Sequence, residues 1–201
     1  ERCADMLMLS GRPNPLILIL LSLPNWLLPQ QIRNFKETLR SKEFSKAFVE
    51  IMESEGSDFR TSDYPNSDPW RKAEIPAANG HGTAAGIAKF FGILANDGQR
   101  DGKKLLSPEI IEQATTVRTS GPDLVLFQAP YKFGLGYMID APFSPIGMKE
   151  DMFGHTGIAG SAGFADLNNK VGFGFTNNRQ HSLGKLYRTS NNLAKKLYEI
   201  L

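Results

Sequence analysis

The stretch FGHTGIAGSAGFADLNNKVGFGF (153–175) decides the fold class of this chain, because its apolar residues alternate with small or polar ones at a period of two. We interpret it as two strands, a turn at Asn168 and Asn169, and a third strand over 171–175. Asparagine tolerates positive φ, so this turn is suited to close an antiparallel hairpin. The C-terminal part of the chain therefore predicts an antiparallel sheet.

Glycines recur in the same stretch at three-residue intervals, at positions 154, 157, 160 and 163. Glycine weakens a strand, so its repetition indicates that a ligand or another chain segment approaches the backbone closely. A twisted or bulged strand packed under a helix would use glycine in the same way. The sequence leaves these explanations open.

Before this stretch the apolar residues follow a helical period. Thr83 is a suitable N-cap for a helix over 83–97, and Ser107-Pro108-Glu109 has the residue types that begin a second helix. We expect the buried face of the first helix to include Ile87, Phe90, Phe91 and Leu94, and that of the second to include Ile110, Ile111 and Ala114, because these residues lie on the apolar stripes.

Other segments complete the pattern. Residues 132–139 alternate with a period of two and predict one more strand. The end of the chain predicts a helix whose stripe comprises Leu183, Leu186, Tyr187, Ser190, Leu193, Leu197 and Ile200. Residues 30–53 predict one or two amphipathic helices, and residues 54–79 predict a loop, because they are rich in Ser, Asp, Pro and Asn.

The order of these segments predicts an α+β fold, with helices first, then antiparallel strands, then a C-terminal helix. We expect one domain over residues 1–201. Within it, residues 13–120 form a lobe made mainly of helices and loops, and residues 121–201 form the antiparallel strands and the C-terminal helix.

The composition excludes several classes of protein. With 23 Lys and Arg against 21 Asp and Glu, the net charge of +2 is too small to indicate nucleic-acid binding. The most apolar run, residues 16–21, is far shorter than the ~20 residues that a membrane-spanning helix needs. Cys3 is the only cysteine, which excludes an internal disulfide. No cofactor or metal is expected, and the compartment and oligomeric state stay open.

Patterns of nucleophilic catalysis occur only in weak forms. Ser161 resembles a nucleophile elbow, but strands surround it where the elbow requires a following helix, so we reject that function. The one Ser-x-x-Lys match, 182–185, lies at the start of the last helix and is interpreted as a coincidence. A Tyr-x-Asn match at 64–66 lies in the long loop. His81 and His181 have no companions at metal-ligand spacing.

The chain resembles the serine β-lactamase-like family, which includes β-lactamase-related carboxylesterases similar to penicillin-binding proteins. Four blocks carry the resemblance and occur in the family's order: AEIPAANGHGTAAGIAKFFGILANDG (73–98), LLSPEIIEQA (105–114), FGLGYMI (133–139) and FGHTGIAGSAGFAD (153–166). The resemblance implies the C-terminal part of the β-lactamase/transpeptidase-like fold. It also implies a serine hydrolase that forms an acyl-enzyme with a small ester or amide.

The resemblance further implies where the cleft lies. His155-Thr156-Gly157 matches the family's strand motif, Lys-Thr-Gly or His-Thr-Gly, which lines the catalytic cleft. The N–H of Ile158 would then be one arm of the oxyanion hole, and one such donor is worth about 3 kcal/mol. A side chain at Gly157 would obstruct the acyl group. His155 would donate a hydrogen bond to the substrate or orient the catalytic tyrosine.

The chain departs from the family pattern at the nucleophile. The family places Ser-x-x-Lys near its N-terminus, but none of the 154 residues before His155 contains this motif, so no catalytic serine or lysine is identified. We expect the chain to be the C-terminal portion of a longer hydrolase and to be inactive as given. The alternative is a non-catalytic binding or scaffold protein that keeps the cleft. Either protein would take a small-molecule ester or amide as its partner.

Overall fold

The computed structural model describes residues 19, 22–40, 66–76, 78–123, 126, 129–142, 144–157, 160–179 and 187–201. The described residues form these elements: η1 Asn25–Leu27, α2 Gln30–Arg40, α4 Asp68–Lys72, α5 Ala84–Ala95, β1 Gln99–Arg100, β2 Lys103–Lys104, α6 Pro108–Thr115, β3 Thr119–Pro122, β4 Pro130–Phe133, β5 Met138–Asp140, β6 Met152–Thr156, β7 Ala162–Asp166, β8 Val171–Phe175 and α7 Arg188–Ile200.

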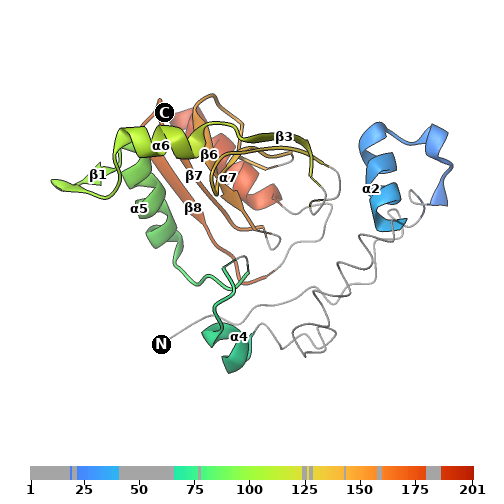
Figure 1. Ribbon diagram of the computed structural model, residues 1–201, viewed down its shortest axis with the longest axis horizontal. Coiled ribbons are helices and arrows are strands. Elements are labelled where there is room, and N and C mark those ends of the chain that lie inside the picture. The colour runs from blue at the N-terminus through green and yellow to red at the C-terminus, as the bar shows by residue number, and fades with distance from the viewer. Residues whose placement is uncertain are drawn as a thin grey trace.

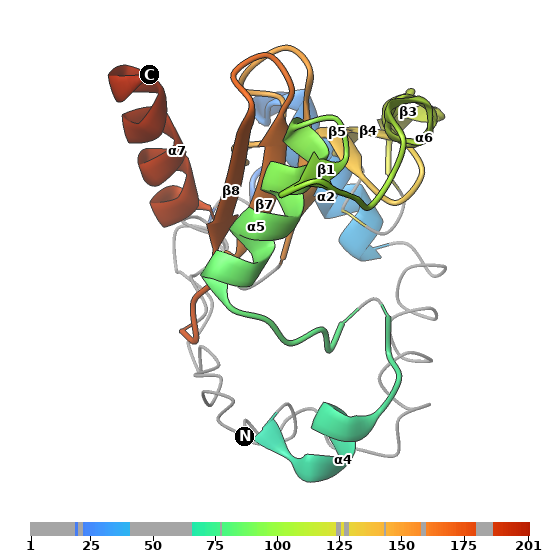
Figure 2. The same cartoon turned by 90° about the vertical axis from the view of Figure 1, so that its left-hand side faces the viewer.

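The centre of the fold is a six-stranded antiparallel sheet whose strands, β3 to β8, lie in sequence order (Figure 1). A separate two-stranded hairpin is formed by β1 and β2. Helix α7 covers one face of the sheet and α5 the other (Figure 2). The predicted α+β class is confirmed, including the order of helices, antiparallel strands and C-terminal helix.

Side chains that alternate along the strands fill two apolar cores, one on each face of the sheet. On the α7 side, Met152 and Phe164 pack with Ala194. On the α5 side, Phe153 and Ala165 pack with Phe91. Because β6 and β7 contribute to both cores, they are buried on both faces over most of their length.

Helix α5 lies against the backbone of the last two strands. A Cβ atom at Gly172 would overlap the backbone of Gly92, and one at Gly174 would overlap the carbonyl of Ala84. At Gly163, a Cβ would overlap the Phe91 ring. The close approach that the glycine-rich sequence predicted is therefore made here by another chain segment, namely a helix packed on the strands.

The predicted strand over 132–139 is wrong: this segment forms two short antiparallel strands, β4 and β5, joined by a turn. Lys132 pairs with Asp140 and Phe133 with Met138, with a register shift between them. Gly136 has φ +80°, a conformation that favours glycine and reverses the chain. The sequence alternates through the turn by chance, which hid the reversal.

The predicted starts of two helices are confirmed, but their buried faces differ in part from the prediction. Thr83 Oγ1 accepts the Gly86 N–H at the start of α5, and Ser107 Oγ accepts the Ile110 N–H at the start of α6. Phe90, however, is 40% exposed and Ile110 50% exposed. Phe91, Leu94 and Ile111, which the same stripes include, are buried as predicted.

Near the N-terminus, α2 confirms a helix in the first part of 30–53, whereas residues 41–65 lie outside the described residues. The loop predicted over 54–79 contains the helix α4. Ser67 Oγ accepts the Trp70 N–H there and Pro69 stands in the first turn, so a capped start was present within a segment rich in loop residues.

Helix α7 is confirmed, but the face that packs on the sheet is rotated from the predicted stripe. Leu193 is 46% exposed and Ile200 is 73% exposed. Ser190, a member of the predicted stripe, is fully buried. Ala194 and Tyr198, which lie outside that stripe, pack on the core under the helix. The buried face thus includes small and polar side chains, which hydrophobicity alone does not reveal.

A buried carboxylate joins α7 to the turn between β7 and β8. Asp166 accepts the Tyr198 hydroxyl at 2.6 Å, and Asn169 donates to it from its backbone N at 2.9 Å and from Nδ2 at 2.8 Å. The predicted hairpin is confirmed, but positive φ falls on Lys170 (55°), not on an asparagine. The side chain of Asn169 acts as a hydrogen-bond donor instead.

These bonds decide the ionisation of both partners. Burial alone would raise the pKa of Asp166, but hydrogen bonds from Tyr198 and Asn169 outweigh burial and lower that pKa below its ordinary value. Burial, followed by the bond to Asp166, raises the pKa of the Tyr198 hydroxyl. The folded state therefore favours an ionised carboxylate beside a neutral phenol.

The observed orientation of α5 predicts different costs for its two phenylalanines. Phe91→Ala should lower the free energy of unfolding by about 3–5 kcal/mol, because it leaves a cavity between the helix and the sheet. Phe90→Ala should cost about 1 kcal/mol, mainly the loss of its edge-to-face contact with Phe91 at 5.3 Å between centroids. Urea unfolding of both variants measures the difference, and equal costs would contradict the orientation.

The Asp166–Tyr198 bond predicts a pH dependence with two limbs. Because the folded-state pKa of Asp166 lies below its unfolded value, its contribution is present above about pH 4 and is lost as pH falls further. Because the folded-state pKa of Tyr198 is raised, its contribution is present below about pH 10 and is lost as pH rises further. Urea unfolding across pH measures both limbs.

Tyr198→Phe should flatten the acid limb and cost about 1–3 kcal/mol at pH 7, since it removes a donor from a buried carboxylate. Tyr131→Phe is the matched control. Burial raises the pKa of Tyr131 to about 12, yet its hydroxyl makes no hydrogen bond to Asp166. If both variants changed the acid limb equally, the Asp166–Tyr198 bond would not be its source.

Candidate functional site

The end of β6 has an unpaired edge. Strand β6 pairs with β7 along its whole length, from Met152 with Asp166 to Thr156 with Ala162. On its other side, β5 pairs with it only where Met138 lies opposite Gly154. No strand in the described part of the chain pairs with that side beyond Gly154. Backbone groups on that side therefore have no ladder partner among the described strands.

The three residues of the predicted motif point in the directions that a strand requires. His155 is exposed, whereas Thr156 is buried and donates from Oγ1 to Met138 Sδ at 3.5 Å. Residue 155 therefore lies on the α5 face of the sheet and residue 156 on the α7 face, as alternation along β6 predicts. Ile158 lies outside the described residues.

The His155 ring is held by its own strand. Its Nδ1 lies 2.9 Å from the Thr156 carbonyl oxygen, and this is a hydrogen bond when Nδ1 carries the proton. In that neutral tautomer, Nε2 presents a lone pair to the surroundings. His155 is thus arranged to accept a hydrogen bond at the open end of β6. Donation from Nε2, the role expected from the sequence, requires the protonated ring.

Hydrogen bonds in the turn after β6 set the direction of the backbone. Gly157 donates its N–H to the Ser161 carbonyl at 2.9 Å, on the β7 side, and its own carbonyl accepts the Gly160 N–H at 2.8 Å. Consecutive residues of a strand direct their N–H and C=O groups to opposite sides. The backbone groups of Thr156 are therefore directed toward the unpaired edge.

Ser161 lies beside this end of the strand, a position that the sequence analysis did not predict. A Cβ atom at Gly157 would lie 2.6 Å from Ser161 Oγ. The space above Gly157 that we expected a substrate to need is thus next to a serine hydroxyl of the same molecule. The signal was the four-residue separation of Gly157 and Ser161 around a glycine-rich turn, which brings them together.

Other candidate residues from the sequence do not join this site. Strand β7 follows Ser161 directly, so the rejection of a nucleophile elbow is consistent with the structure. The Ser-x-x-Lys match at 182–185 lies outside the described residues. Of the Tyr-x-Asn match at 64–66, only Asn66 is described. Within the described part of the chain, no three His, Cys, Asp or Glu side chains come together as a metal site would require.

Among the residues that the structure describes, none of the helices combines the length and the apolar character needed to cross a bilayer.

The β-lactamase family model matches residues 40–195, which is most of the chain and includes the whole open end of β6. This chain belongs to the β-lactamase family. The resemblance seen in the four sequence blocks is therefore confirmed, and the fold agrees with it.

One named relative of the chain is an esterase/β-lactamase. The chain is 41% identical over 112 residues to the esterase/β-lactamase LipL of Mycobacterium tuberculosis strain H37Rv, and the match covers 55% of this chain. It spans only 25% of that relative's length.

Similar solved structures include a penicillin-binding protein homologue and a carboxylesterase. A penicillin-binding protein homologue from Caulobacter crescentus is 40% identical with a TM-score of 0.53, covering 57% of this chain and 30% of that one. A family VIII carboxylesterase is 31% identical with a TM-score of 0.58, covering 67% of this chain and 37% of that one. This chain therefore corresponds to a minor part of each relative's length.

The contact between Gly157 and Ser161 generates a prediction. Gly157 is not among the residues with positive φ, so an alanine there is opposed by the Ser161 hydroxyl and not by the backbone. Gly157→Ala should lower the free energy of unfolding by about 1 kcal/mol, the lower end for overpacking, because the hydroxyl must move.

Ser161→Ala alone should change the free energy of unfolding little. Gly157→Ala combined with Ser161→Ala should lower it less than Gly157→Ala by itself. Urea unfolding of the wild type and the three variants gives the double-mutant cycle that measures this interaction. Additive costs would show that the two residues do not interact.

Proposed function

We propose that this chain forms the strand wall of the active site of a serine hydrolase that acts through an acyl-enzyme on a small ester or amide. The unpaired edge of β6 at His155–Gly157, in a chain of the β-lactamase family, carries this proposal. The names of the relatives, an esterase/β-lactamase and a carboxylesterase, support an ester or a cyclic amide as the substrate class.

The proposed reaction has two steps. A serine hydroxyl oxygen attacks the substrate carbonyl carbon and gives up its proton, the carbonyl electrons move to the carbonyl oxygen, and the tetrahedral oxyanion collapses to expel the alcohol or amine, which takes up that proton. Water then attacks the acyl-enzyme carbonyl and gives up a proton, and collapse of the second oxyanion releases the acid and the serine oxygen, which takes up that proton. In both steps we assign the N–H of Ile158, the residue after the motif His155-Thr156-Gly157, as one donor to the oxyanion.

We assign His155 a role at the same end of the strand. Its Nε2 accepts a hydrogen bond from a hydroxyl group of the substrate or from the attacking water, since Nδ1 is engaged by the Thr156 carbonyl. Ser161 stands beside Gly157 and limits the space on the β7 side. The substrate would then lie along β6 on the side that β5 leaves open.

We place the nucleophile outside these 201 residues. Ser-x-x-Lys occurs once in the chain, at 182–185, downstream of the strand that it would have to precede. The 201-residue chain should therefore hydrolyse neither p-nitrophenyl acetate nor nitrocefin above background, because a positioned oxyanion donor without a nucleophile gives little rate enhancement.

The test uses the chain extended upstream in its reading frame as far as a Ser-x-x-Lys segment. The extended protein should hydrolyse p-nitrophenyl acetate and lose this activity when the serine of that segment is replaced by alanine. In the extended protein, His155→Ala should lower kcat/KM by about one to three powers of ten, the range for a lost proton-transfer or hydrogen-bonding group. Arg118→Ala, an exposed residue outside the site, is the control.

Three results would contradict the proposal. Wild-type kinetics of the His155→Ala protein would remove β6 from the active site. Stoichiometric labelling of the 201-residue chain by a fluorophosphonate would place the nucleophile within it, at Ser161 or Ser182. An upstream reading frame without Ser-x-x-Lys would favour a non-catalytic binding or scaffold protein.

A further inference from the structure

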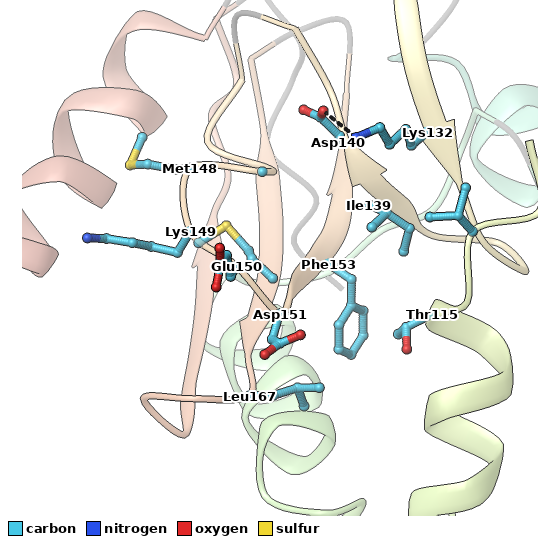
Figure 3. A pocket seen from close by; sticks show the side chains of 13 residues that line it. Thr115, Lys132, Ile139, Asp140, Met148, Lys149, Glu150, Asp151, Phe153 and Leu167 are labelled. Atoms are coloured by element: carbon cyan, nitrogen blue, oxygen red, sulfur yellow. Dashed lines mark ion pairs between the residues drawn. The ribbon is translucent and has the colours of Figure 1, made fainter. Parts of the chain in front are cut away.

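A second concave site lies at the other end of β6. Its volume is about 440 Å³, and its wall includes Phe153 at the start of the strand. Phe153 and Gly157 are four residues apart, or about 13 Å along an extended strand, so this cavity is separate from the unpaired edge. It is closed on one side by the end of α6 and on the other by residues 147–151 (Figure 3).

The floor of the cavity is apolar. Ile139 from β5, Phe153 from β6 and Leu167 from the end of β7 border it (Figure 3). All three belong to the core on the α5 side of the sheet, which holds them in place. A rigid apolar floor of this kind can receive a hydrocarbon group of a ligand.

The basic side chains on the rim are already engaged. Lys132 forms an ion pair with Asp140 at 3.5 Å. Lys149 places Nζ 5.2 Å from the centroid of the Tyr198 ring, and in Figure 3 its chain extends away from the cavity. Neither lysine therefore offers a free cationic donor to a ligand on the floor.

The remaining polar groups of the rim accept hydrogen bonds. The Glu150 carboxylate is exposed and has no hydrogen bond or ion pair to the described part of the chain. The Asp151 carboxylate accepts from Asn168 Nδ2 at 3.2 Å. Thr115, which also lines the cavity, donates its hydroxyl proton to the Ile111 carbonyl at 2.9 Å, so its oxygen keeps lone pairs that can accept a hydrogen bond. Among the described side chains, the rim thus combines two negative charges with a third acceptor.

We propose that this cavity binds a ligand that carries a primary ammonium group on an apolar body. An ammonium group has three N–H donors and no acceptor, which complements the carboxylates of Glu150 and Asp151 and the Thr115 oxygen. The apolar body lies on Ile139, Phe153 and Leu167. This inference goes beyond the proposed function and does not depend on it, because no residue of the unpaired edge takes part.

Binding is tested on the 201-residue chain with 4-phenylbutylammonium as the probe, and with 4-phenyl-1-butanol and 4-phenylbutyrate as its neutral and anionic counterparts. Met148 and Met152 line the cavity, so methyl-labelled methionine signals report occupancy in NMR titrations. Met148→Leu assigns its signal. The ammonium compound should bind most tightly, the alcohol more weakly and the carboxylate least. Of the three, only the ammonium compound should bind more weakly when NaCl is added.

Variants locate the charge recognition. Glu150→Gln and Asp151→Asn should each lower the affinity for the ammonium compound about two- to fivefold, the range for partly exposed ion pairs. The affinity for the alcohol should stay unchanged. Asn tolerates the positive φ of position 151 (53°), so Asp151→Asn keeps the backbone. Glu112→Gln, which changes the net charge equally at an exposed residue of α6 that does not line the cavity, is the matched control and should have no effect.

Equal affinities for the ammonium compound and the alcohol would overturn the proposal, because the cavity would then select only for an apolar body. If Glu112→Gln weakened binding of the ammonium compound as much as Glu150→Gln does, the selectivity would come from the net charge of the chain and not from the rim, which would also overturn the proposal. So would the absence of any shift of the Met148 and Met152 signals at millimolar probe.

Discussion

The contact between the backbone of α5 and the backbone of β8 is the constraint on which the rest of the structure depends. Gly172 and Gly174 leave no room for a side chain, since Gly92 and Ala84 of the helix occupy it. A helix that lies this close is fixed both along the strand and across the sheet. Its register then decides which residues of β7 and β6 it covers and which it leaves exposed.

The register of the sheet carries this constraint to the candidate site. Gly174 pairs with Gly163, and Gly163 pairs with His155, so the three residues form one row across the sheet. The first turns of α5 cover the first two members of the row. The third, His155, lies beyond the helix and is exposed. The same row thus explains why two of its positions are glycine and why the last one holds an accessible imidazole.

Much of this arrangement could be predicted from residue patterns that act locally. Caps at Thr83 and Ser107 and the period of two near Phe153 depend on neighbours in sequence, and each gave a correct element. The buried faces of the helices could be predicted only in part. Phe90 and Phe91 have the same hydrophobicity, and only the position of the sheet decides which one is covered.

The site was predicted in part. Alternation placed His155 and Thr156 on opposite faces correctly, because a strand leaves little choice. The acceptor role of His155 Nε2 depends on the Thr156 carbonyl, and the position of Ser161 depends on the geometry of a glycine-rich turn. Neither can be predicted from spacing alone. The cavity at Phe153 is composed of segments far apart in the chain, and no motif marks it.

Strand β6 therefore has two chemically different ends: an open backbone edge at His155–Gly157, and a cavity with an acidic rim at Phe153. The central claim is that the hydrolytic site lies at the first of these. A crystal structure of the upstream-extended protein with a fluorophosphonate bound to its catalytic serine tests this most directly. The account predicts the phosphonyl oxygen beside the unpaired edge, within hydrogen-bond distance of a backbone N–H of the segment after Thr156. A phosphonyl group at the Phe153 end, or away from β6 altogether, would contradict it.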